Sequence, residues 1–296
     1  MPQSIPGSGT TDMTETNFLL AEFCRNRLAL IGAVIIGIIV LCAIFAPLIA
    51  PFDPAEQNLR ERLQTPSIQH PFGTDDLGRD IFSRVVFGSR ISLSIGICVV
   101  GITALFGTIL GLLSGYGGRA IDEVIMRFVD IMLAFPSIIL ALIIAGLLGP
   151  GVVNVIIALS LTQWPAYTRL VRGMTLSMKE KEFVEAARAL GASDTYILRK
   201  HILLNASNPI IVLATMDIAQ TIIFAAALSF LGLGIQPPTP EWGSMLKAGI
   251  PYLRSATYIT FFPGILLMLT VLAFNFIGDG IRDTLDPHTK EMTLVK

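Results

Sequence analysis

Long apolar segments alternate with polar ones between residues 28 and 278. Six of them approach the ~20 apolar residues that a helix rising ~1.5 Å per residue needs to cross a hydrocarbon core of ~30 Å. Backbone groups in lipid must be hydrogen-bonded within their own segment, so each segment predicts a helix. The expected fold is therefore all-α, a polytopic membrane protein with six transmembrane helices. The predicted spans are Leu28–Ala50, Ile91–Leu113, Ile131–Gly149, Val152–Val171, Pro209–Gly232 and Ile259–Gly278.

The polar segments organise the chain around these spans. They predict an N-terminal tail over residues 1–27, the first span with a long outer loop over 28–90, a membrane core over 91–284 and a C-terminal tail over 285–296. Inside the core, residues 172–208 form a polar, basic loop. Trp164-Pro165 is expected to break the fourth span close to its end, because proline removes a helical hydrogen bond.

Lysine and arginine are unevenly shared between the two sides of the predicted bundle. With the N-terminus inside, the inner segments carry fourteen of the 21 basic residues and the outer segments carry the other seven. Short inner loops of membrane proteins carry an excess of Lys and Arg. We therefore expect both termini and the 172–208 loop to lie in the cytoplasm, with the chain crossing the cell (inner) membrane several times.

Composition supports the membrane class and narrows the chemistry. Hydrophobic residues make up 53% of the chain, charged residues 15%, and mean hydropathy is +0.69. The chain is therefore more apolar and less charged than a typical soluble domain. A net charge of −1 gives no reason to expect nucleic acid. The three cysteines lack metal or redox spacing. Phosphate-cradling, zinc-protease and Gly-x-Ser-x-Gly patterns are also missing, so we expect no catalytic residue, metal or cofactor.

The polar loop contains a helix–turn–helix pattern. Phe183, Ala187 and Leu190 recur at i, i+4 and i+7 and predict one apolar stripe on a short helix. Gly191 suits the left-handed residue that ends it, and Ser193 suits the N-cap of a second short helix. Asp194 lies in the first turn of that helix, with Arg199–His201 toward its end. The apolar stripe favours equally a groove on a partner or packing on the chain's own bundle.

The first outer loop contains a short acidic run with arginine beside it. Its candidate contact residues are Asp75, Asp76, Arg79 and Asp80. Closely spaced carboxylates suit calcium, but the run lacks the twelve-residue calcium-loop pattern. Internal ion pairing is the favoured interpretation. Beyond the fifth span, Trp242 is expected at the membrane–water boundary.

Polar residues inside the spans need partners or water. Asp217 lies eight residues into the fifth span, with Gln220 one turn further on, and a lipid-facing charge there costs at least ~2.5 kcal/mol. Both are candidates for lining a pore, and a hydrogen-bonded packing role for Asp217 is equally favoured. Gly107, Gly111 and Gly115 recur every four residues and predict a groove for close helix packing.

Several of these segments together resemble a known family. Glu185-Ala186-Ala187 followed by Gly191 resembles the signature loop of permease subunits of ATP-binding cassette (ABC) importers. The run Gly73 to Asp80, the run Leu228 to Trp242 and the run Leu272 to Pro287 are similar to the second, C-type permease of dipeptide and oligopeptide importers. The resemblance extends from about Arg25 to Pro287. One departure is Leu204, where the family usually has proline after His201-Ile202-Leu203, which puts a kink there in doubt.

The resemblance implies a type I ABC importer permease that forms half of a translocation path. Expected partners are a sister permease in a heterodimer, two ATP-binding subunits, an extracytoplasmic solute-binding protein and the lipid bilayer. ATP-driven closure of the motor would move the loop and switch the bundles between two states. The outer-loop acids would contact the binding protein or the sister permease. The residues expected to couple to the ATP-binding subunit are Phe183, Glu185, Ala186, Ala187, Leu190, Gly191, Ser193 and Asp194.

Two alternatives concern the cargo and the energy source. Nickel or a chelated metal is a possible cargo of this subgroup, although His70, His201 and His288 all lie outside the spans, which favours peptides. An ion-coupled secondary transporter would use Asp217 as its coupling acid. The chain shows no internal duplication of the kind such transporters carry, and they have no use for the Glu185–Gly191 pattern.

Overall fold

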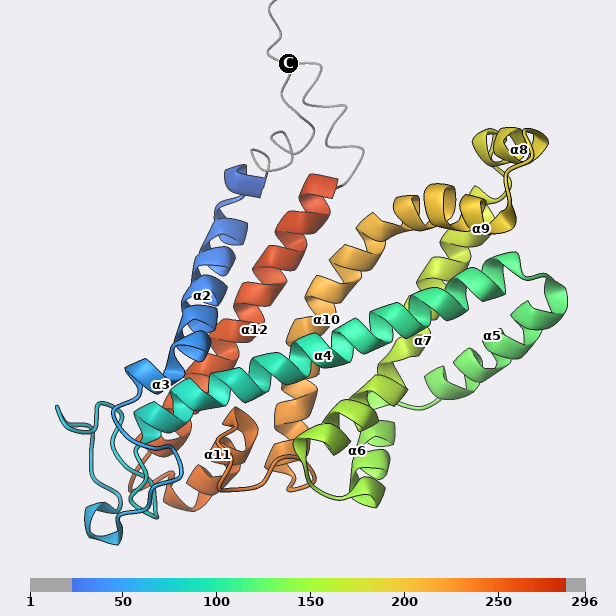
Figure 1. Ribbon diagram of the computed structural model, residues 1–296. Helices are drawn as coiled ribbons and strands as arrows, with labels where there is room; N and C mark the ends of the chain where they lie inside the picture. The colour runs from blue at the N-terminus through green and yellow to red at the C-terminus, as the bar shows by residue number, and fades with distance from the viewer. Residues whose placement is uncertain (1–22, 286–296) are drawn as a thin grey trace, which may run out of the picture.

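The computed structural model describes residues 23–285, and all regular elements in this range are helices (Figure 1). Besides one isolated bridge between Thr74 and Asp80, no strand pairing occurs among the described residues. The helices are α2 (Arg27–Ile44), α3 (Ala46–Ile49), α4 (Ile81–Tyr116), α5 (Arg119–Leu133), α6 (Ser137–Leu148), α7 (Val152–Met178), α8 (Glu182–Ala189), α9 (Asp194–Tyr196), α10 (Leu204–Phe230), α11 (Trp242–Gly249) and α12 (Tyr258–Leu285), with a π-turn at Ile197–Leu203 and 3₁₀ turns at Leu59–Glu61 and Ile250–Tyr252.

Four of these helices are long and apolar enough to cross a membrane. They are α2, α4, the continuous helix Asp194–Phe230 that contains α10, and α12. The pair α5 and α6 counts as a fifth crossing if it is taken as one bent span. Helix α7 has 27 residues and sufficient length, but it is more polar than the others. The described residues thus support four or five spans by length and composition, against six predicted.

Two predictions about the middle of the chain were wrong. The span predicted at Ile131–Gly149 is divided between α5 and α6, which meet at an angle of 87°. The chain turns at Ala134 and bends at Phe135, because proline disfavours the helical conformation at the residue before it. Conversely, Pro165 does not break α7, which continues through it to Met178. Neighbouring helices can accommodate a proline in a packed membrane helix, as they do here.

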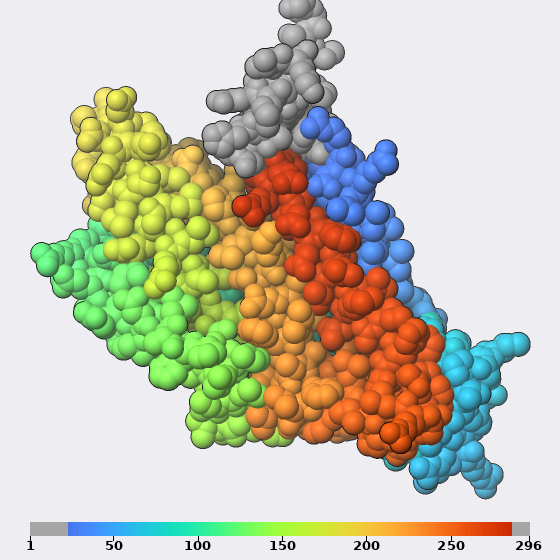
Figure 2. Space-filling view, turned by 180° about the vertical axis from the view of Figure 1, so that it is seen from behind, coloured from blue at the N-terminus to red at the C-terminus, as the bar shows by residue number. Residues whose placement is uncertain are grey.

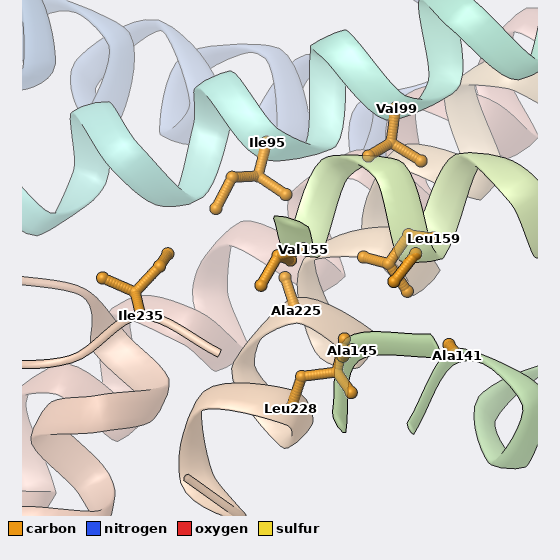
Figure 3. Packing of buried hydrophobic residues seen from close by; sticks show 10 residues of the cluster. Ile95, Val99, Ala141, Ala145, Val155, Leu159, Ala225, Leu228 and Ile235 are labelled. Atoms are coloured by element: carbon orange, nitrogen blue, oxygen red, sulfur yellow. The ribbon is translucent and has the colours of Figure 1, made fainter. Parts of the chain in front are cut away.

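The packed core lies between α4, α6, α7 and α10. Figure 3 shows Ile95 and Val99 of α4 facing Val155 and Leu159 of α7. Alanines of α6, α7 and α10 complete this cluster together with Leu228 of α10 and Ile235 of the loop that follows. The further members are Ala141, Ala145, Ala158, Ala225, Leu228 and Ile235.

The glycine groove predicted on the second span is confirmed as the contact between α4 and α7. A Cβ atom added at Gly107 would lie 2.5 Å from the Tyr167 Cβ, and one at Gly115 would lie 2.5 Å from the Thr175 Cβ. Such distances leave no room for any side chain. The backbones of α4 and α7 therefore pack directly against each other toward the end of the molecule that carries α8.

Candidate functional site

The predicted helix–turn–helix is present in the polar loop. Helix α8 spans Glu182–Ala189, and Gly191 has the left-handed φ of +84° that ends it. The Ser193 side chain accepts a hydrogen bond of 3.4 Å from the Tyr196 amide and so caps α9. The second helix is not short, however. It continues from α9 through the π-turn Ile197–Leu203 into α10, and Figure 1 shows the bend there.

The π-turn explains how a surface loop becomes a transmembrane helix without a break. One extra residue in the turn absorbs a change of direction while hydrogen bonding continues. Arg199, Lys200 and His201 consequently lie inside this turn, not at a helix terminus as predicted. Leu204 continues the helix where the family usually has proline. The second half of the loop thus forms one uninterrupted helix with α10.

Helix α8 has an inner face that the sequence pattern missed. Val184 is fully buried and packs with Ile197 and Ile202 of the π-turn. Partly buried residues from the ends of α4 and α7 cover the same cluster, among them Leu112 and Met178. The loop is therefore held on the chain's own bundle. The i, i+4, i+7 pattern did not include Val184, because at ~100° per residue Val184 lies to one side of that stripe.

The stripe that the sequence did identify faces outward. Leu190 is 89% exposed and Phe183 is 44% exposed, while Ala187 is half-buried at the base. These residues form one side of an open groove of about 720 Å³. The structure thus confirms packing on the chain's own bundle for one face of α8, and binding of a partner by the other face stays a prediction. The groove is lined by Phe183, Ala186, Ala187, Leu190, Gly191, Ala192, Ser193, Tyr196 and His201.

The acidic residues of the loop lie around a second, polar hollow. Glu185 and Asp194 line it together with Lys179, Arg188 and Tyr116. The Tyr116 hydroxyl donates to the Asp194 carboxylate at 2.5 Å. Glu185 and Asp194 are exposed, so the loop presents an apolar groove on one side and a charged hollow on another. In Figure 2 the loop protrudes at one corner of the molecule, and the outer loop lies at the opposite corner.

The polar residues of α10 lie beside those of α7. Thr221 Oγ1 donates to Gln163 Oε1 at 2.8 Å. One turn earlier, Asp217 is half-buried and close to the buried hydroxyl of Tyr167. Gln220 is exposed. The structure thus brings Asp217 toward α7 and leaves Gln220 on the surface of this subunit.

The acidic run of the outer loop is internally paired. Asp75 Oδ2 lies 2.7 Å from Arg79 Nε and 3.7 Å from Arg84 Nε, and all three side chains are buried. Asp80 accepts the Ser83 amide at 2.7 Å as the N-cap of α4. Asp80 also lies 2.9 Å from His70 Nδ1. Within residues 23–285 no three His, Cys, Asp or Glu side chains form a metal-binding group.

Asp76 differs from the other three candidates of this loop. It is partly exposed, whereas Asp75, Arg79 and Asp80 are buried in ion pairs and caps. Of these four residues, only Asp76 has a side chain that another molecule could reach. The loop is therefore a folded unit held by its charges.

At the outer end, Trp242 was misplaced and Glu241 was not identified from the sequence. Trp242 is fully buried, with Nε1 donating to the Val85 carbonyl at 3.1 Å, so its predicted position at the membrane boundary was wrong. Glu241 is buried and caps α11 by accepting the Gly243 and Ser244 amides, each at 2.9 Å. Burial raises the pKa of Glu241. An acid placed just before Trp-Gly-Ser was the available signal, since acids cap helix N-termini.

The chain matches known proteins over most of its length. Residues 107–291 match the model of the family described as binding-protein-dependent transport system inner membrane component. Residues 19–66 match the N-terminal TM domain of oligopeptide transport permease C.

Relatives of similar length confirm this assignment. The dipeptide transport system permease protein DppC of Alkalihalophilus pseudofirmus is 51% identical over 90% of this chain and 88% of its own. The glutathione transport system permease protein GsiD of Escherichia coli is 49% identical over 91% and 89%. The di/tripeptide transport system permease protein DppC of Pseudomonas aeruginosa is 44% identical over 91% of each chain.

A solved structure confirms the fold. A chain of the inward-facing MetNI methionine ABC transporter superposes with a TM-score of 0.56 at 20% identity, covering 69% of this chain and 97% of that one. At this identity the likeness concerns the fold alone. The family match covers well over half of the sequence, and the relatives share about half of their residues with it. The chain therefore belongs to the binding-protein-dependent transport system inner membrane component family of ABC importer permeases.

Proposed function

We propose that this chain is the membrane permease subunit of an ATP-driven importer of di- or oligopeptides, and that the loop 172–208 couples it to a separate ATP-binding subunit. The cargo follows the relatives, which are a dipeptide, a di/tripeptide and a glutathione permease. The observation that carries the coupling role is the exposed apolar groove of α8 on a loop anchored from its other face.

The groove has the properties of a docking surface for a protein. Aromatic and aliphatic side chains at an exposed, concave site are typical anchors of protein interfaces. Phe183 and Tyr196 flank His201, with ring centroids 5.8 Å and 5.7 Å from it. Leu190 at the rim is the most exposed of the apolar side chains there. An apolar site of this kind in water is stabilised when a partner covers it.

The other loop residues support the shape of this surface. Gly191 allows the turn because its φ of +84° suits glycine. Ser193 caps α9, and Asp194 holds the turn through Tyr116. Glu185 is exposed beside Lys179 and Arg188. We expect Glu185 to accept a charge-assisted hydrogen bond from the ATP-binding subunit.

ATP hydrolysis is assigned to that partner and not to this chain. The sequence contains no Gly-x-x-x-x-Gly-Lys-Ser/Thr loop to cradle phosphates. A solute-binding protein outside and a sister permease beside this subunit complete the proposed assembly. Asp76, as the partly exposed acid of the outer loop, is the candidate contact with one of these two chains.

We place the translocation path along α7 and α10. A cavity of about 640 Å³ lies between α7, α10 and α12, and its lining includes Met174, Val212, Met216 and Arg282. Asp217 follows Met216 directly, and Gln220 lies one turn further along the helix. A carboxylate at this depth suits the ammonium group of a peptide and would be costly facing lipid. The sister permease would close the path against the exposed Gln220.

Both termini and the α8 loop are proposed to be cytoplasmic, in the cell (inner) membrane. The twofold excess of Lys and Arg in the inner segments supports this orientation. In Figure 1 the ends of α2 and α12 that adjoin the tails lie toward the same side as α8, and the loop before α4 lies toward the other. The two loops therefore face opposite compartments.

Co-purification of the assembled complex tests the docking proposal. Leu190→Glu places a charge on the groove, and we expect it to abolish association of the ATP-binding subunits while the two permeases still pair. Ile68→Glu is the matched control, because Ile68 is fully exposed on the outer loop. Equal recovery of ATP-binding subunits with both variants would contradict a docking role for the groove.

A further inference from the structure

Tyr116 connects the coupling loop to a helix that is distant in the sequence. It is the last residue of α4, and its hydroxyl donates to Asp194 Oδ1 at 2.5 Å. The Arg188 guanidinium donates to the same hydroxyl oxygen at 3.4 Å. Arg188 lies near the end of α8 and Asp194 at the start of α9. One phenol thus binds both sides of the Gly191 turn.

We propose that Tyr116 is the positioning residue that makes α4 follow the coupling loop when the ATP-binding subunit moves it. The inference rests on the proposed docking role of α8. Helices α7 and α10 flank the loop in the chain and must move with it, because α10 is continuous with α9. Helix α4 ends 78 residues before Asp194 and is not continuous with the loop. It packs on α7 through its glycines, and the phenol adds a direct bond from α4 to the turn itself.

The contact joins a hydroxyl donor to a charged acceptor. Such charge-assisted hydrogen bonds are roughly twice as strong as neutral ones. The Tyr116 ring also packs against the buried cluster of Val184, Ile197 and Ile202. The ring and the hydroxyl therefore have separable roles: the ring supports packing, and the hydroxyl holds the turn.

Helix α4 is built to carry a displacement to the other side of the membrane. It has 36 residues, or ~54 Å at 1.5 Å per residue. Beside Tyr116, Gly115 packs directly on Thr175 of α7. At its other end Asp80 caps it within the outer loop, and the Val85 carbonyl accepts from buried Trp242. A shift at Tyr116 thus reaches the residues that join α4 to the outer loop and to α11.

The ratio of ATP hydrolysed to peptide imported tests this role. The complete complex, with sister permease, ATP-binding subunits and binding protein, is reconstituted in lipid vesicles with a labelled dipeptide outside. In Tyr116→Phe the ring remains and both hydrogen bonds of the hydroxyl are lost. We expect normal assembly and basal hydrolysis, but about tenfold less uptake per ATP, as for loss of one charge-assisted bond. A purely structural role would lower uptake and hydrolysis together and leave the ratio unchanged.

Two further variants keep the test decisive. Tyr252→Phe is the matched control, since the Tyr252 hydroxyl makes no hydrogen bond among the described residues and lies at the outer end; its ratio should equal the wild type. Asp194→Asn weakens the same bond from the loop side without touching the ring. Combined with Tyr116→Phe, it should lower uptake per ATP little further, because both changes act on the same interaction.

The outcomes separate this inference from the docking proposal. A wild-type ratio in both Tyr116→Phe and Asp194→Asn would overturn the role of Tyr116 while leaving docking intact. Failure of docking itself appears elsewhere, as normal recovery of ATP-binding subunits with Leu190→Glu.

Discussion

Adding a single methyl group at Gly111 should weaken the contact between α4 and α7. A Cβ atom there would lie 2.7 Å from the Val171 Cβ, 2.8 Å from the Thr168 carbonyl oxygen and 3.0 Å from the Arg172 amide nitrogen. Carbon contacts are optimal at ~3.5–4.0 Å, so the helices must separate by about 1 Å. Two of the three atoms are backbone and cannot rotate away.

The expected cost follows from two opposing effects. Overpacking of this kind destabilises by ~1–3 kcal/mol, and the better helix propensity of Ala over Gly offsets up to ~1 kcal/mol. Gly111→Ala should therefore lower the free energy of unfolding by up to about 2 kcal/mol, which is the largest overpacking cost less the full propensity gain. Gly101→Ala is the matched control on the same helix, because nothing lies within 4 Å of its Cβ position. The control should be neutral or slightly stabilising.

Tryptophan fluorescence during denaturant titration of the detergent-purified protein measures this difference. The indole of Trp164 on α7 contacts Phe106 of α4 edge to face, with ring centroids 5.6 Å apart, so its emission reports on this interface. An earlier transition for Gly111→Ala than for Gly101→Ala is predicted. Equal transitions would refute the direct backbone packing of α4 on α7.

Three further changes have distinct expected outcomes. Asp75→Ala should cost ~3–5 kcal/mol of stability, because it leaves the buried Arg79 guanidinium unpaired; the partly exposed Asp76→Ala should change the same denaturation midpoint little. Burial raises the folded-state pKa of Glu241 above its ordinary value of 4.5, so wild-type stability falls as pH rises from that value. The stability of Glu241→Gln relative to wild type should therefore increase between pH 5 and pH 8, and a gap that does not change with pH would contradict this. Asp217→Asn should reduce peptide uptake at unchanged protein levels, whereas normal uptake would assign Asp217 to packing.

Apolar length was sufficient to predict the helical membrane class and most helix positions, and the Glu185–Gly191 pattern with the other matching runs was sufficient to predict the family. The helix–Gly191–helix of the loop and the Ser193 cap also followed from local chemistry, because backbone conformation and capping are short-range. The close packing at Gly107, Gly111 and Gly115 was predictable for the same reason: small residues at spacing four permit it.

The failures concern contacts between distant parts of the chain. Helix α7 continues through Pro165, whereas the chain turns between α5 and α6 at Pro136. The surrounding helices decide between these two outcomes. The inner face of α8 depends on Val184 meeting the π-turn, which no spacing rule contains. Trp242 is buried because Val85 of α4 lies opposite it. These positions are set by tertiary partners, so the local sequence alone was not enough.

The most direct test of the central claim is uptake of a labelled dipeptide into vesicles that contain the complete complex, with and without ATP on the α8 side. The account predicts uptake that requires ATP, persists when ion gradients are abolished, and is lost in Leu190→Glu. Uptake that follows an ion gradient without ATP, or that survives Leu190→Glu, would contradict it. ATP-dependent uptake of nickel chelates in place of the dipeptide would contradict the peptide assignment and leave the coupling intact.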